Sequence, residues 1–428
     1  MSRNVPTIKR GYTVNSKRIF ISDIHMGDMR STNQVSEFKN YCWFYHPDSS
    51  PDADRPEILR RFLEEYCFSD TSVTEVVIVG DLFDEWVCPA QFDPTEPPYP
   101  APLPKGEQYR KIAVATQNLP VIETLRKLAS QDRLVYVPGN HDMFADKSVV
   151  NEIFPGIRCP DSKDGHYVYR ADGIWAEHGH WYGMFNAPHP AGSGSGFARS
   201  HLPLGYFITR INAEEALRTG SMLSLPQVFK EWIEHVFSEV PEAKDPEAKV
   251  GGLVDTVLMN LFNTLVSNHA YGQEGAVMNG FDGIPGKIMW EEIKTRYSNI
   301  YDAWPDNHPD NVGPLNAILS DAGNLDQAAR LVTLRREDVK IVVCGHTHDY
   351  RLASYSNSPY PPDEIPPEDN RIYANSGAWT NDTRRCTFVE TERSDDGKHL
   401  VCLREWLKDL STGQYKARDV QPDEWVVA

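Results

Sequence analysis

Five short clusters of Asp, His and Asn, each directly after a run of apolar residues, constrain the fold of this chain more than any other feature. Short apolar runs of this kind are typical of buried β-strands. Polar side chains just past the end of such a strand project from a rigid platform into one pocket. The five arrangements are residues 18–21 before Asp23 and His25, 76–79 before Asp81 and Asp84, 134–137 before Asn140 and His141, 174–176 before His178 and His180, and 341–344 before His346 and His348. They predict that distant parts of the chain meet around bound metal.

The first half of the chain alternates these strands with segments of helical spacing. Apolar residues recur every three or four positions over residues 58–66 and 121–128, which is the period of an amphipathic helix. The alternation predicts an α/β fold whose strand ends carry the functional loops. Further strands are expected at residues 372–377, 386–389 and 400–406, as a β-rich C-terminal tail.

The character of the sequence changes after a Gly/Ser run at residues 191–196, which is typical of a flexible hinge. Three amphipathic helices are expected beyond it: one begins at Ser224, one covers residues 253–266, and one covers residues 289–304 and ends before Pro305. We therefore predict three parts: residues 1–190 as the first part of a catalytic domain, residues 191–335 as a large helical insertion acting as a lid, and residues 336–428 as the second part of the catalytic domain with the β-rich tail.

Composition narrows the class of protein. The chain has 43 Lys and Arg against 61 Asp and Glu, a formal net charge of −18, which disfavours binding to long nucleic acids because phosphate backbones require a basic surface. No apolar stretch approaches the roughly 20 residues that span a bilayer, and residues 1–17 lack the apolar core of a secretory signal. The seven cysteines form no CxxC pair, so no disulfide framework is expected. These features predict a cytoplasmic protein without a transmembrane segment.

The donor types in the clusters define the chemistry of the expected metal site. Hard divalent cations prefer carboxylate and amide oxygens, whereas imidazole suits manganese, iron and zinc. Asp81 is the best candidate for a bridging ligand, because its two oxygens can hold two cations together. Two ions about 3.5–4 Å apart can bind one phosphate and polarise a water. Since no cluster contains cysteine in its polar motif, a structural zinc site is not expected.

The five clusters resemble, in order, the five sequence blocks of the calcineurin-like metallophosphoesterase family. This resemblance implies a four-layer α/β fold, in which a two-sheet β-sandwich is flanked by helices, here with the large helical insertion. It also implies two divalent metal ions, with Mn²⁺ expected first and Fe, Zn, Ni or Mg as alternatives. Carried over residue by residue, Asp23, His25, Asp81 and His348 would hold one ion, and Asp81, Asn140, His178 and His346 the other.

The resemblance further implies the catalytic roles. A metal-bridging hydroxide would attack phosphorus in line, while His141 assists the leaving group and Asp84 orients that histidine. The expected substrate is a small phosphorylated molecule. His178, as the first histidine after its strand, fits the ligand role better than His180, which is expected to face substrate or a neighbouring acid.

Several alternatives stay open. The first two clusters most resemble the branch of UDP-2,3-diacylglucosamine pyrophosphohydrolase, which typically has arginine at the position of His141 and a shorter lid. Protein Ser/Thr phosphatases are also similar, but they have Arg-Gly where this chain has Glu85 and Trp86. A small-nucleotide phosphodiesterase or nuclease and a non-catalytic scaffold remain possible, as do monoesterase, diesterase and pyrophosphatase activities. The pair Arg335 and Arg336 is either a charged helix end or a weak substrate-binding candidate. The oligomeric state is open.

Overall fold

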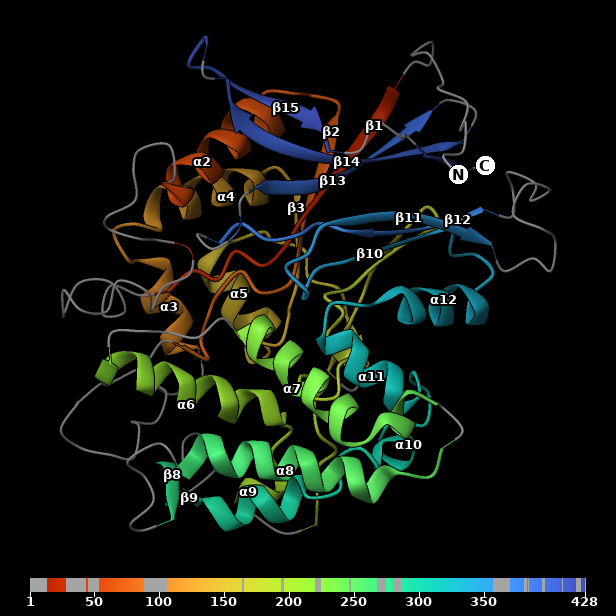
Figure 1. The fold of residues 1–428 in the computed structure, drawn as a ribbon. Helices are drawn as coiled ribbons and strands as arrows, with labels where there is room; N and C mark the ends of the chain where they lie inside the picture. Colours follow the sequence, from red (N-terminus) through yellow and green to blue (C-terminus); the bar gives the residue numbers. More distant parts are fainter. Residues whose placement is uncertain are drawn as a thin grey trace.

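The described part of the chain forms two β-sheets that face each other, with helices on their outer sides (Figure 1). The computed structural model describes residues 14–27, 44, 54–87, 106–163, 165–193, 196–219, 225–245, 248–267, 275–279, 286–356, 370–380, 383, 385–394, 397–409, 411–420 and 425–427. Within these residues no helix is both long enough and apolar enough to cross a membrane.

The first sheet combines the N-terminal strands with the C-terminal segment. Its strands lie in the order β15-β14-β13-β1-β2-β3, and β16 pairs with β14. The strand β1 is parallel to β2 and antiparallel to β13, so the strands expected at residues 386–389 and 400–406 of the β-rich tail complete this sheet. The bounds are β1 Val14–Ile21, β2 Val73–Val79, β3 Leu134–Val137, β13 Cys386–Ser394, β14 His399–Lys408, β15 Tyr415–Asp419 and β16 Trp425–Val427.

The second sheet contains the strands before the last two clusters, in the order β11-β12-β10-β7-β6. The strand β10 is parallel to both β7 and β12, whereas β6 and β11 pair antiparallel at the edges. A short hairpin, β4–β5, precedes β6. The bounds are β4 Ser162–Lys163, β5 His166–Tyr167, β6 Tyr169–Ala171, β7 Ile174–Ala176, β10 Ile341–Cys344, β11 Arg351–Ser356 and β12 Asn370–Asn375.

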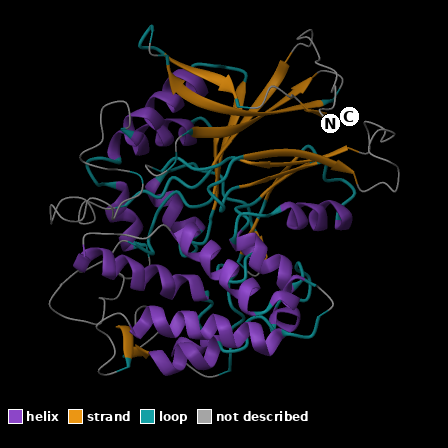
Figure 2. Cartoon of the chain, viewed as in Figure 1, coloured by secondary structure: helices purple, strands orange, loops and turns teal. Residues whose placement is uncertain are grey.

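Three apolar cores hold these layers together. Between the sheets, Phe20 and Val77 of the first pack with Ile341 and Ile372 of the second. Helices cover the outer face of the first sheet with a second core: α2 Arg55–Arg61, the π-helix η1 Phe62–Phe68, α3 Glu107–Ala113, α4 Leu119–Ser130 and α5 Lys147–Ile153. The third core joins the second sheet to the inserted helices. The predicted four-layer α/β fold is confirmed (Figure 2).

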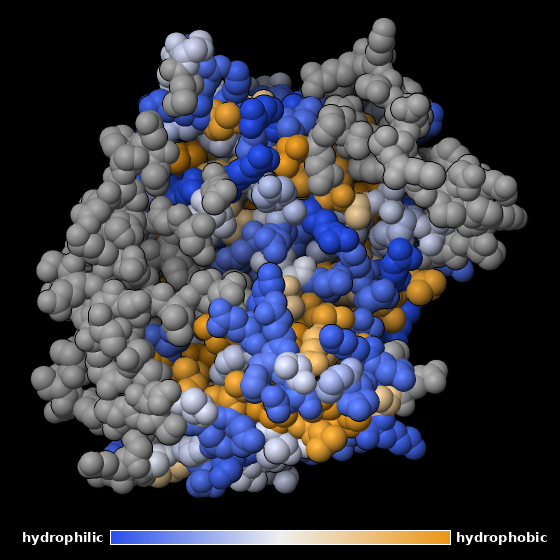
Figure 3. Space-filling model, in the orientation of Figure 1, coloured by the Kyte–Doolittle hydropathy of each residue, from blue (hydrophilic) through white to orange (hydrophobic). Residues whose placement is uncertain are grey.

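The segment after the hinge is mainly helical and gathers at one end of the molecule, below the sheets in Figure 1. On the face in Figure 3, apolar side chains reach the surface over this segment. A hairpin of β8 Ala276–Asn279 and β9 Lys287–Met289 interrupts it. The short helix η2 His180–Tyr182 precedes this segment. The helices of the segment are η3 Gly196–Arg199, α6 Leu204–Thr219, α7 Leu225–Glu239, η4 Pro241–Lys244, α8 Gly251–Ser267, α9 Trp290–Tyr297, α10 Trp304–Asn307, α11 Pro314–Asp321 and α12 Asp326–Arg335.

One expected helix of this segment is wrong. The sequence predicted a continuous helix to Trp304, but α9 ends at Tyr297 and α10 begins only at Trp304. The side chain of Asp255 in α8 accepts the backbone N–H groups of Tyr301 and Asp302 at 2.8 and 3.1 Å, so a tertiary contact stabilises the turn. Proline then stands in the first turn of α10, where its missing N–H costs nothing. The expected start of α7 at Ser224 lies outside the described residues.

Candidate metal centre

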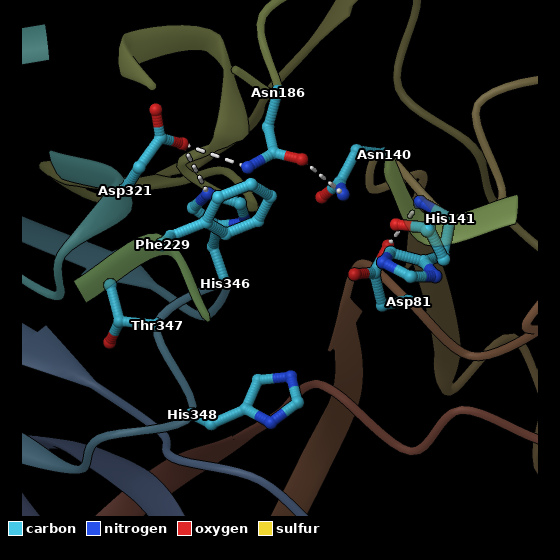
Figure 4. Close-up of a pocket in the computed structure, with 10 residues that line it drawn as sticks. Asp81, Asn140, His141, Asn186, Phe229, Asp321, His346, Thr347 and His348 are labelled. Carbon is cyan, nitrogen blue, oxygen red and sulfur yellow. Dashed lines mark hydrogen bonds and ion pairs between the residues drawn. The ribbon is translucent and has the colours of Figure 1, made fainter. Parts of the chain in front are cut away.

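All five clusters meet at the same end of the two sheets. The strands β1, β2 and β3 run parallel in one sheet, and β7 and β10 run parallel in the other. Because the carboxyl ends of parallel strands lie at one edge, the loops that follow them converge there (Figure 4). The structure brings together the seven predicted ligands Asp23, His25, Asp81, Asn140, His178, His346 and His348.

The first predicted ligand set surrounds a common point. The Nε2 atom of His25 lies 3.7 Å from Asp81 Oδ2 and 3.9 Å from Asp23 Oδ1. The Nε2 atom of His348 lies 3.5 Å from Asp23 Oδ1 and 3.1 Å from His25 Nε2. Two imidazole nitrogens and two carboxylates from three clusters therefore converge, which is the donor set that a transition-metal cation prefers.

The second set meets the first at Asp81. The Nε2 atom of His178 lies 3.0 Å from Asp81 Oδ2 and 3.1 Å from Asn140 Oδ1. Its Nδ1 lies 2.8 Å from the backbone oxygen of Val79, which fixes the N–H on Nδ1 and leaves the lone pair on Nε2. The ring of His346 is 5.2 Å from that of His178. Asp81 thus lies within reach of both sets.

The ligand atoms lie close enough together to bind divalent metal ions. In three overlapping groups, ligand atoms from three residues all lie within 4.8 Å of one another: Asp23 with His25 and His348, Asp23 with Asp81 and His178, and His25 with Asp81 and His141. Their carboxylates and imidazoles are buried, except that the ring of His348 is partly exposed. Buried carboxylates require compensating positive charge, and metal ions would supply it at the point of convergence.

Metal binding is expected to tighten as pH rises. In the metal-free protein burial disfavours a charged His25 ring, but Asp84, Asp81 and Asp23 raise its pKa to about 9. Burial likewise opposes the charge on His178, whereas Asp81 and Asp23 raise its pKa to about 9. These protons must leave before the rings can bind metal. The raised values stabilise the metal-free fold fully below about pH 6.5, and this contribution is lost as pH rises through about 9.

Calorimetric titration with Mn²⁺ in two buffers of different ionisation enthalpy measures the protons released on binding. We expect release, and an affinity that increases between about pH 6 and about pH 9. An affinity that stays constant over this range, with no proton release, would contradict the protonation of these rings.

Backbone strain is concentrated at the same residues. Seven described non-glycine residues have φ in the left-handed region, and five of them are predicted ligands: Asp23 at 52°, His25 at 54°, Asp81 at 54°, His346 at 73° and His348 at 58°. Such conformations cost of order 1–3 kcal/mol each and persist only where the surroundings impose them. The free energy of folding therefore includes a conformational cost in these loops, and the strained backbone orients the five side chains toward one another.

Close packing explains two glycines of the clusters. A Cβ at Gly139 would overlap Oδ1 of Asp81, and a Cβ at Gly345 would overlap the side chain of Ser22 and approach Asp23. Any other residue at these two positions would displace a ligand of the neighbouring cluster. The glycine before Asn140 and the glycine before His346 are thus required by the site itself.

Asp84 holds two histidines of the site. Its Oδ1 is 2.8 Å from His141 Nδ1, and its Oδ2 is 3.0 Å from His25 Nδ1. Despite burial, these contacts hold the pKa of Asp84 well below its usual range. Trp86 stacks on the ring of His141 with centroids 4.4 Å apart. One carboxylate therefore orients both a predicted ligand and the predicted leaving-group histidine.

Replacing Asp84 by asparagine is expected to lower kcat by about 10–100-fold and to weaken metal binding, because the amide cannot accept from both imidazoles. Steady-state kinetics and elemental analysis check this. The matched control is Asp255→Asn, since Asp255 is also buried but lies in α8 and only caps a turn. Equal effects of the two substitutions would show that Asp84 has only a structural role.

Two residues of the site were missed by sequence reasoning. Asn140 Nδ2 donates to Asn186 Oδ1 at 3.3 Å, and Asn186 Nδ2 donates to Asp321 Oδ1 at 2.8 Å (Figure 4). The same Oδ1 lies 3.7 Å from His346 Nε2, and burial raises the pKa of Asp321 to about 7. Asp321 ends the helix α11 inside the inserted segment. No strand directly precedes it, so it lacks the pattern of a polar residue after an apolar strand that identified the other candidates.

One candidate of the sequence analysis does not belong here. Arg335 and Arg336 line a different cavity, on the helix side of the second sheet, and neither lines the pocket of the metal centre. The reason is topological, because these residues precede β10 whereas His346 and His348 follow it.

His180 is buried beside His178, with ring centroids 5.4 Å apart, and burial lowers its pKa well below the usual value.

Comparison with known proteins agrees with this geometry. The family model of the calcineurin-like phosphoesterases matches residues 16–191, which include four of the five clusters. The fold carries the fifth cluster, with His346 and His348, into the same site from outside the matched segment. No curated protein sequence matches the chain. The chain thus contains a calcineurin-like phosphoesterase domain, which indicates a hydrolase that acts on phosphoric ester bonds.

Proposed function

We propose that this protein hydrolyses a small phosphorylated substrate with two divalent metal ions that share Asp81. The observation that carries the proposal is the position of the Asp81 carboxylate, whose Oδ2 lies within 3.7 Å of His25 Nε2 and 3.0 Å of His178 Nε2. A carboxylate between two donor sets is the arrangement expected of a bridging ligand.

Each ion has its own set of donors in this proposal. Besides Asp81, the residues Asp23, His25 and His348 would hold one ion, and Asn140, His178 and His346 the other. When bound, two such ions neutralise phosphate oxygens and lower the pKa of a water in the site. Mn²⁺ is the proposed metal, since the donors mix carboxylate, amide and imidazole.

His141 is the proposed proton donor to the leaving oxygen. Its side chain lines the pocket (Figure 4), and Asp84 holds its Nδ1 at 2.8 Å. Proton exchange with the leaving oxygen therefore falls to Nε2. A positioned acid of this kind contributes about 10²–10⁴-fold to the rate.

The inserted segment at residues 191–335 is proposed to select the substrate. Thr209 of α6 and Phe229 of α7 line the same pocket as Asp81 and His141. The helix α6 is also fixed to the second cluster, because the buried Arg210 pairs with Glu85 at 2.9 Å. This anchoring favours a fixed wall over a lid that opens at the hinge.

Changing Phe229 to alanine is expected to alter the ranking of substrates mainly through KM. Phe229 lines the pocket, and an apolar side chain is suited to contact an apolar leaving group rather than the charged phosphate. Phenyl phosphate should lose about five- to tenfold in kcat/KM relative to a small alkyl phosphate, as expected for one lost apolar contact. Phe237→Ala on the same helix is the control, since Phe237 does not line the pocket. If Phe229→Ala leaves the ranking of substrates by kcat/KM unchanged, Phe229 does not contribute to substrate selection.

The activity itself is tested on the Mn²⁺-loaded protein with p-nitrophenyl phosphate, bis-p-nitrophenyl phosphate and a panel of phosphate anhydrides. The proposal requires turnover of at least one of them that chelation removes and metal restores. Preference for the diester would identify the small-nucleotide phosphodiesterase alternative. A fully metal-loaded protein without turnover on the whole panel would instead support a non-catalytic scaffold.

A further inference from the structure

A second cavity lies apart from the metal centre. It has a volume of about 1000 Å³ and lies beside β6, β7 and the end of α12. Its size matches that of small-molecule sites in proteins. None of the residues that line it also lines the metal pocket. We call it the arginine groove, after Arg158, Arg170, Arg335 and Arg336 in its wall.

Two of these arginines stand out because both lie over the same indole. The Cζ atom of Arg170 is 4.3 Å and that of Arg336 is 4.5 Å from the ring centroid of Trp175. Neither guanidinium has an ion pair with any carboxylate in the described part of the chain. By contrast, Arg158 pairs with Glu75 at 2.8 Å.

Like charge is thus gathered in a chain whose net charge is −18. Burial and the neighbouring Arg336 lower the pKa of Arg170 from its ordinary value, although the charges of Asp338 and Glu177 act in the opposite direction. Asp161 and Asp310 also line the groove, but neither forms an ion pair with these two arginines within the described residues. An anion bound by both guanidiniums would relieve their repulsion and use their planar donor geometry.

Another part of the wall is aromatic. The ring of His166 stacks on Trp181 with centroids 4.6 Å apart and planes 9° apart. Glu177 fixes this wall, because it accepts hydrogen bonds from Trp175 Nε1 and from Tyr182 Oη and pairs with His166. A rigid aromatic surface beside two guanidiniums suits a ligand that has both a flat body and an anionic group.

We propose that the arginine groove binds a small aromatic phosphate or phosphonate, with its anionic group on Arg170 and Arg336 and its ring against the wall of His166 and Trp181. This site is distinct from the metal centre and does not depend on the proposed catalytic function. Glu177, which contacts the lining residues His166, Trp175 and Tyr182, directly precedes the predicted ligand His178, so the two sites are neighbours along one strand end.

Calorimetric titration of the Mn²⁺-loaded protein with phenylphosphonate tests the proposal, because its C–P bond resists hydrolysis. We expect one binding event at the groove besides any event at the metal centre. Arg170→Ala/Arg336→Ala should weaken the groove event by at least about tenfold, whereas Asp81→Ala should leave it intact. Inorganic phosphate, which lacks the ring, should bind the groove more weakly than phenylphosphonate.

The control Arg351→Ala/Arg393→Ala removes the same charge at exposed positions outside the groove, and it should bind as the unchanged protein does. A conservative pair, Arg170→Lys/Arg336→Lys, keeps the charge and should restore part of the affinity if the alanine pair is poorly folded. Two results would overturn the proposal: binding of phenylphosphonate that persists in both the alanine and the lysine pair, or binding that disappears only with Asp81→Ala. The two arginines would then only pack on the ring of Trp175.

Discussion

Asp81→Ala is expected to lower kcat/KM for phosphate-ester hydrolysis by on the order of 10³-fold, since a metal centre contributes several kcal/mol to the transition state. The physical reason is its position between both donor sets, 3.0 Å from His178 Nε2 and 3.7 Å from His25 Nε2. No other described carboxylate lies this close to both rings: Asp23 Oδ1 is 3.9 Å from each. Loss of Asp81 should therefore release metal as well as activity.

Kinetics and elemental analysis of the same sample measure the two losses together. Asp255→Asn serves as the control for a buried carboxylate outside the site, and circular dichroism verifies that both variants are folded. Because Asp81 also accepts the backbone N–H of His141 at 2.9 Å, Asp81→Asn is a milder second variant that keeps an acceptor. Full activity in both Asp81 variants would contradict a bridging role.

His141→Ala is expected to lower kcat by about 10²–10⁴-fold for an alkyl phosphate, while the metal content stays unchanged. Asp84 holds His141 Nδ1 at 2.8 Å and Trp86 stacks on the ring, so the side chain is placed for proton transfer. With p-nitrophenyl phosphate the loss should be much smaller, because p-nitrophenolate leaves without a proton.

The comparison of the two leaving groups separates proton donation from metal binding. This distinction is needed because His141, His25 and Asp81 also form one of the groups close enough to hold an ion. If His141→Ala loses metal, or loses the same factor with both substrates, then His141 acts as a ligand and not as the acid.

Local patterns were sufficient to predict the strands that lead into the site. The runs before Asp23, Asp81, Asn140, His178 and His346 form β1, β2, β3, β7 and β10. The runs next to the clusters are largely buried on both faces, so they are almost continuously apolar, which predicts a strand clearly. The pairing of β1 with β13 could not be predicted in the same way, because it joins Phe20 to Val389 across most of the chain.

The contributions of Asn186 and of Asp321 in the insertion to the site could not be predicted from the sequence either. Asp321 and Asn186 act through a hydrogen-bonded chain to Asn140, and such a chain depends on tertiary contacts rather than on spacing. The same limit applies to the break between α9 and α10, which depends on Asp255 in another helix. The left-handed backbone of the ligands is likewise a product of the assembled site.

The metal content of the purified, active protein tests the central claim most directly. Elemental analysis after loading with Mn²⁺ and removal of excess metal, combined with activity on the same sample, gives ions per chain and turnover together. The account predicts about two ions per chain and activity that rises with the second ion. Full turnover in protein that holds no metal, or that is saturated by a single ion, would contradict it.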